Sequence, residues 1–160
     1  MILRALPEGT KTKLTPEPAL PVDTDGLPWI PTGTGKSFRP LRFAADGWSE
    51  LMRLEPGSAV ALHRHTGEVH AFNIRGTREI LGTGELVGPG GYVYEPAGTV
   101  DGWGAIGDKP CVVHIKVTGT IEYLDNDGQV IESVNAETQR AVYLAWCRAH
   151  DVPPSERILG

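Results

Sequence analysis

The chain has 160 residues, a net charge of −5, and 40% hydrophobic and 22% charged residues, which is typical of a single globular domain with its own core. The acidic balance and the absence of a Lys/Arg cluster argue against nucleic-acid binding, and no apolar run approaches the ~20 residues of a membrane span. The N-terminus lacks the apolar stretch of a secretion signal, and Cys111 and Cys147 cannot make a disulfide framework. We therefore expect a cytoplasmic protein.

Turn residues dominate the pattern of the chain. Its 20 glycines and 13 prolines separate short apolar runs, which favours an all-β sandwich or barrel. The proline-rich residues 1–37 are predicted to form an extended arm packed on the barrel, and residues 38–134 the barrel itself. Strands are expected at residues 38–43, 47–54, 58–65, 69–75, 77–81, 92–94, 99–105, 111–118, 120–124 and 129–133.

Residues 135–160 are predicted to form one helix and a tail. Asn135 can cap a helix that begins near residue 136 and ends near residue 149, because its side chain can accept a free backbone N–H of the first turn. The helix carries one apolar stripe, made of Val142, Ala145, Trp146 and Ala149 and broadened unevenly by Ala141, Leu144, Cys147 and Arg148. We expect this stripe to pack on the outside of the barrel or against a second subunit.

The stretch from residue 57 to 76, GSAVALHRHTGEVHAFNIRG, holds three of the five histidines. His63 and His65 are separated by Arg64 on a predicted strand, so the two imidazoles share one face. Two residues along a strand span about 6.5–7 Å, and imidazoles at that spacing can converge on one metal ion. The pair therefore predicts a metal site.

The residues after this pair read as a turn and a returning strand. Residues 66–68 give a turn signal, so we expect the chain to fold back as an antiparallel hairpin. If Asn73 and Arg75 face solvent, then His70 and Phe72 face the interior. This phase predicts that a third imidazole points into the same space as the first two.

Two stretches resemble the paired motifs of the cupin family. The first motif is matched in register by Gly57, the H-x-H pair and Gly76, and the second by Gly90, Pro96 and Gly98. The resemblance implies a double-stranded β-helix, or jelly-roll, barrel with a metal inside. The slot that usually holds the histidine of the second motif is occupied by Asp101.

The cupin pattern leaves the acidic slot of the first motif open. Counting back from Gly76 gives Val69, and counting on from His65 permits His70, which the strand phase favours. Asp101 is a candidate ligand, or alternatively a turn residue with a local hydrogen bond. The implied metal ligands are His63, His65, His70 and Asp101. Such a set suits iron(II), with zinc, nickel and manganese as alternatives, and a three-histidine site remains if the aspartate is not a ligand.

Three runs, HRHTGEVHAFNIRG, YVYEPAGTVDGW and IEYLDNDG, are similar to cupins grouped with 2,4′-dihydroxyacetophenone dioxygenase and the anti-sigma-factor cupins. This similarity implies a non-haem iron dioxygenase that uses O₂ to cleave a C–C bond beside a carbonyl. Its substrate would be a small aromatic hydroxyketone or a diketone. The alternatives are a non-redox metal-dependent isomerase or hydrolase, and a cupin that binds a metal or metabolite without turnover.

Aromatic residues on the barrel strands are candidates for the wall of a substrate pocket, with ordinary packing as the alternative. They are Phe72, Tyr92, Tyr94 and Trp103. His114 lies between apolar neighbours and is either an acid/base group of that pocket or a hydrogen-bonded core histidine. A homodimer or higher oligomer is expected, because the edges of a small barrel and the apolar face of the helix need cover.

Overall fold

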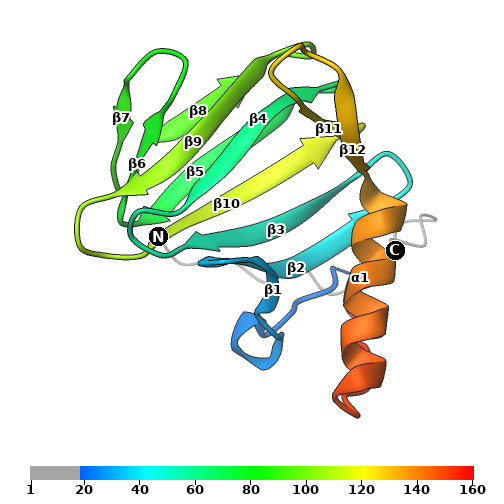
Figure 1. Cartoon of the computed structure of the whole chain (residues 1–160). Coiled ribbons are helices and arrows are strands. Elements are labelled where there is room, and N and C mark those ends of the chain that lie inside the picture. Colours follow the sequence, from blue (N-terminus) through cyan, green and yellow to red (C-terminus); the bar gives the residue numbers. More distant parts are fainter. Residues whose placement is uncertain (1–18) are drawn as a thin grey trace, which may run out of the picture.

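The computed structural model describes residues 19–160, which form two facing six-stranded antiparallel sheets (Figure 1). The strand order is β1-β2-β3-β10-β5-β8 in the first sheet and β12-β11-β4-β9-β6-β7 in the second. The first sheet consists of β1 (Ile30–Gly33), β2 (Lys36–Ala44), β3 (Gly47–Leu54), β10 (Cys111–Thr118), β5 (Val69–Arg75) and β8 (Tyr92–Glu95). The second consists of β12 (Val130–Val134), β11 (Ile121–Leu124), β4 (Ala59–His65), β9 (Val100–Ile106), β6 (Thr77–Ile80) and β7 (Leu86–Val87).

From β3 onward the chain passes back and forth between the two sheets, which confirms the predicted all-β jelly roll. Side chains alternate between the two faces of a strand, and the inner faces of both sheets carry the core. Buried core residues from the two sheets include Phe38, Leu54, Val113 and Val117, and Val60, Trp103 and Ala105. Burial of these apolar surfaces holds the sheets together and encloses the space in which the histidines lie.

The predicted hairpin after the histidine pair is wrong. Strand β4 pairs with β9 and β11, whereas β5 lies in the other sheet and pairs with β10 and β8. Residues 66–68 therefore cross from one sheet to the other. Gly67 permits this crossing, because a Cβ at this position would overlap the backbone carbonyl of Thr118. A tight turn of this kind looks the same in sequence whether the next strand pairs with the last one or leaves it.

Part of the predicted N-terminal arm is a strand. Residues 1–18 of that arm lie outside the described residues. Strand β1 pairs antiparallel with β2, with Ile30 opposite Phe38, and forms an edge of the first sheet. A 3₁₀ turn, η1 (Thr24–Gly26), precedes it.

The helix α1 spans Ala136–Ala149, as predicted, and lies beside β2 on the outside of the barrel (Figure 1). Asn135 caps it, accepting the backbone N–H of Thr138. Its buried side chains are Tyr143 and Cys147. Cys147 belongs to the predicted broadening of the stripe, whereas Val142 of the stripe itself is exposed. No helix within residues 19–160 is long and apolar enough to cross a membrane.

The C-terminal tail explains which face of the helix is buried. After α1 the chain folds back through η2 (Glu156–Ile158), whose Ile158 is fully buried. The Tyr143 ring lies 6.1 Å from the Phe43 ring of β2, and its hydroxyl accepts the backbone N–H of Ser155. The tail therefore shifts the buried face of the helix by one residue from the predicted stripe.

Candidate functional site

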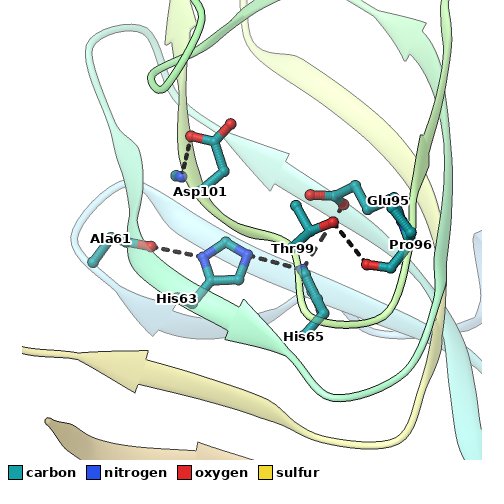
Figure 2. A network of polar contacts seen from close by, with 8 residues as sticks. Ala61, His63, His65, Glu95, Pro96, Thr99 and Asp101 are labelled. Atoms are coloured by element: carbon teal, nitrogen blue, oxygen red, sulfur yellow. Dashed lines mark hydrogen bonds and ion pairs between the residues drawn. The ribbon is translucent and has the colours of Figure 1, made fainter. Parts of the chain in front are cut away.

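Two imidazoles meet inside the barrel. His63 and His65 extend from β4 toward the first sheet and are 4% and 3% exposed. Their Nε2 atoms are 3.0 Å apart, and the rings are nearly perpendicular, at 87° (Figure 2). The predicted shared face of the pair is therefore confirmed.

A β-bulge in β4 positions His63. Val60 lies opposite Trp103 of β9 and His63 lies opposite Asp101, so β4 has one more residue than β9 between these two pairs. Val60 and His63 are three residues apart and would face opposite sides of a regular strand. The extra residue of the bulge lets both side chains face the core. Within the bulge the carbonyl of Ala61 accepts the Nδ1–H of His63 at 2.7 Å (Figure 2). This hydrogen bond puts the proton of the neutral His63 ring on Nδ1. Nε2 therefore carries a lone pair that can bind a metal.

The second sequence motif holds the backbone of His65. The His65 N–H donates to the carbonyl of Thr99 at 3.0 Å, and the His65 carbonyl accepts the N–H of Gly98 at 2.7 Å. Gly98 has a φ of +89°, a conformation that favours glycine. The Thr99 hydroxyl closes the turn by donating to the carbonyl of Pro96 at 2.7 Å (Figure 2). The two motifs therefore fix one histidine each.

Both imidazoles are neutral near pH 7. Burial lowers the pKa of His63, although its hydrogen bond to Ala61 and the charge of Asp101 oppose the shift. Burial, together with the neighbouring His63, lowers the pKa of His65 to about 4. The interior therefore presents uncharged nitrogen donors, which is the form of histidine that binds metals.

The separation of the two nitrogens suits adjacent ligands of one metal ion. Two bonds of about 2.1 Å that meet at a right angle put their nitrogens about 3.0 Å apart. Without a cation, either the Nε2 lone pairs face each other or His65 donates a hydrogen bond from Nε2. In both cases His65 Nδ1 is buried without a partner among the described residues. Within residues 19–160, no group of three or more His, Cys, Asp or Glu side chains is already arranged to hold a metal.

Glu95, which neither sequence motif singles out, is the acidic group that lies beside the pair. It is directly opposite Val69 across β5 and β8, which places its side chain on the inner face. Its Oε2 is 3.8 Å from His65 Nε2 (Figure 2). Burial raises the pKa of this carboxyl, and the charge of Arg78 opposes the shift. The residues that fit a metal are therefore two neutral imidazoles and one carboxylate, a donor set known for non-haem iron.

Asp101 lies opposite His63 on β9 but serves a different contact. Its Oδ1 accepts two backbone N–H groups, from Gly82 at 2.8 Å and from Gly102 at 2.6 Å. The carboxylate is turned away from the imidazoles (Figure 2). The structure therefore places Asp101 as a tie between β9 and the loop after β6, as the alternative interpretation in the sequence analysis has it, and not among the converging donors.

The prediction that His70 joins the cluster is wrong. On β5 the buried residues are Val69, Ala71 and Asn73, so His70 is on the outer face. Its ring is partly exposed and hydrogen-bonded to the Tyr92 hydroxyl and to Glu68, 3.3 Å from Nε2. The predicted inward face of β5 is wrong because β5 belongs to the other sheet. Its pairing with β10 and β8 puts Val69, Ala71 and Asn73 on the inner face.

Most of the aromatic residues predicted to line the pocket also lie on the outer face of the barrel. Phe72, Tyr92 and Tyr94 are exposed on the outer face of the first sheet. His114 pairs with Phe72 and Leu51 on that face, so it cannot act as an acid/base group inside the barrel. Trp103 alone of the four predicted aromatic residues lines the internal cavity.

This cavity, of about 30 Å³, lies between the sheets and is lined by further polar groups that belong to neither sequence motif. Besides the histidines and Glu95 they are the buried side chains of Glu50 and Arg78. Tyr123 also lines it, with its ring 5.6 Å from that of His63. Inward alternation along the strands was the available signal for Glu50 and Glu95, but it could be used only once each strand's sheet was known.

Comparison with known families decides the relationship that the motifs indicated. The ChrR cupin-like domain family matches residues 18–118, which is more than half of the chain. The chain belongs to this cupin family. A comparison with curated protein sequences found no match.

Solved structures share the fold of this cupin. An RmlC-like cupin from Ralstonia eutropha superposes with a TM-score of 0.80 at 22% identity, covering 88% of this chain and 92% of that one. A protein of unknown function from the same organism gives 0.77 at 23% identity, covering 89% and 98%. An acetylacetone dioxygenase from Acinetobacter johnsonii gives 0.69 at 21% identity, covering 84% and 95%. At these identities the similarity establishes the fold.

Proposed function

We propose that this cupin is a metal-dependent dioxygenase that cleaves a C–C bond beside a carbonyl of a small diketone. The observation that carries the proposal is the approach of His63 Nε2 and His65 Nε2 to 3.0 Å inside a buried cavity. Neutral imidazoles at this distance match adjacent ligands of a first-row divalent metal. We propose iron(II) because it can supply electrons to O₂, and zinc, nickel and manganese suit the same donors.

His63, His65 and Glu95 would hold the metal. A bound iron(II) would supply Lewis acidity toward substrate oxygens and electrons for O₂. The protein contributes the arrangement: the Ala61 carbonyl orients His63, and the turn at Gly98 orients His65. Support of this kind for the ligands typically changes metal affinity by 10- to 100-fold.

The cavity favours a small substrate. Its volume is about 30 Å³, and three of the four aromatic residues expected as its wall lie on the outer face. A cavity of this size holds only the reacting end of a substrate, and we propose that this is the end of an aliphatic diketone. The fold shared with an acetylacetone dioxygenase supports the same substrate class. The remaining wall is mainly aliphatic and keeps water from the reacting groups.

Oxygen uptake tests the proposal. The protein is purified without oxygen, its metal content is measured, and uptake is followed with acetylacetone and with 2-hydroxyacetophenone. We expect bound iron, uptake with acetylacetone exceeding that with the aromatic ketone, and no uptake by His63→Ala. Bound zinc with no uptake after iron loading would contradict the dioxygenase and favour a non-redox isomerase or hydrolase. Absence of any metal would favour a metabolite-binding cupin without turnover.

A further inference from the structure

Arg78 is a buried guanidinium in the wall of the histidine cavity. It lies on β6, is 2% exposed, and lines the same cavity as His63, His65 and Glu95. Arginine stays protonated in proteins, so a full positive charge lies between the sheets. Charged side chains are seldom buried this deeply unless something pairs with them.

The neighbours of Arg78 orient it without using all of its donors. Its Nε–H donates to Asn73 Oδ1 at 2.9 Å, and Asn73 is itself held by donating to the carbonyl of Val87 at 2.9 Å. The guanidinium carbon lies 4.9 Å from the centre of the Trp103 ring. Asn73 therefore holds one edge of the guanidinium, and the Trp103 ring covers one of its faces.

The Nη2 group of Arg78 is buried and has no hydrogen-bond partner among residues 19–160. Glu95 acts on the Arg78 charge, but within the described residues its carboxylate contacts His65 and makes no ion pair with Arg78. An unpaired buried donor on a charged group is costly, and the cost is greater than for a neutral donor. A hydrogen-bond acceptor other than residues 19–160 would remove this cost.

We infer that Arg78 binds a negatively charged oxygen of the ligand, a carboxylate or an enolate, beside the two histidines. The inference rests on the proposed function in identifying this ligand as the substrate. Guanidinium groups match planar oxyanions because their N–H donors form a rigid fork. The cavity of about 30 Å³ admits only the charged end of such a molecule. Glu95 also lines a second, open groove of about 430 Å³ together with Tyr92 and Tyr94, and we place the rest of the molecule there.

Binding of small anions tests this inference. The protein as purified is titrated, without oxygen, with acetate, pyruvate and acetylacetone, and the dissociation constants are measured by ligand-observed NMR. We expect Arg78→Met to weaken binding at least tenfold, while Arg75→Met, an exposed arginine on β5, binds like the wild type. Dependence on Arg78 for acetate and pyruvate identifies a carboxylate, and dependence for acetylacetone alone identifies an enolate.

Equal affinity of Arg78→Met and the wild type would overturn the inference, as would a wild-type protein that binds none of the three probes. If Arg78→Met does not fold, the anion affinity of Arg78→Gln is compared with that of the wild type instead, because glutamine removes the charge and keeps a polar side chain. Anion binding through Arg78 without oxygen uptake would contradict the proposed function alone. Oxygen uptake with no dependence of binding on Arg78 would contradict this inference alone.

Discussion

Val69 and Glu95 lie directly opposite each other across β5 and β8, and both side chains lie on the inner face of the first sheet. Paired residues of antiparallel strands share a face, so this one pair sets the phase of both strands. It brings Glu95 to the histidines. It also puts the next pair, His70 and Tyr94, on the outside.

Replacing Glu95 by glutamine should weaken metal binding. The change keeps the size of the side chain but removes the negative charge next to His65. We expect the dissociation constant for zinc, measured by competition with a chelator, to rise tenfold or more. The matched control is Glu68→Gln, because Glu68 lies on the outer face beside His70 and Tyr94. An equal loss in both variants, or none in Glu95→Gln, would remove Glu95 from the ligand set.

Replacing Asp101 by alanine should affect stability and not metal content. Asp101 Oδ1 accepts the N–H groups of Gly82 and Gly102, and losing this acceptor leaves two donors without their partner. We expect the free energy of unfolding to fall by about 1–3 kcal/mol. Amide exchange at Gly82 should become faster, because the loop after β6 loses its tie to β9. Loss of bound metal at unchanged stability would instead make Asp101 a ligand.

Replacing Glu50 by glutamine should change how stability depends on pH. Burial raises the pKa of Glu50 to about 7, against its hydrogen bonds from Trp48 Nε1 and Gln139. Between about pH 4.5 and 7 the folded protein holds a proton that the unfolded chain releases, so the stability contributed by this group is lost as the pH rises. At about 1.4 kcal/mol per pKa unit, a shift from 4.5 to about 7 makes the full loss about 3–4 kcal/mol.

Glu50→Gln has no such proton to lose. We measure the free energy of unfolding of both proteins by urea denaturation. We expect the value for Glu50→Gln minus the value for the wild type to increase as the pH is raised from 4.5 to 8. The exposed Glu132→Gln serves as control and should follow the wild-type curve. Parallel curves for Glu50→Gln and the wild type would show that the carboxyl ionises normally inside the barrel.

Local features of this chain could be predicted from sequence. The helix from Ala136 to Ala149 follows from its Asn135 cap, and β4 carries the histidine pair on one face because a strand alternates every two residues. Both features depend on neighbours in the sequence.

The partners of each strand could not be predicted in the same way. Residues 66–68 have the composition of a hairpin turn, yet they carry the chain to the other sheet, and the phase of β5 is set by β8 and β10. His70 was misplaced for this reason. Glu95 was missed for the same reason, since its alternation with Tyr94 identifies an inward residue only when the outward face is known.

The metal content of three single variants tests the central claim most directly. His63→Ala, His65→Ala and His70→Ala are each purified from cells grown with added iron and zinc, and bound metal per chain is measured by mass spectrometry. We expect the first two variants to lose the metal and His70→Ala to keep the wild-type amount, because only the first two imidazoles face the cavity. Retention of metal by His63→Ala or His65→Ala, or its loss in His70→Ala, would contradict the site described for this protein.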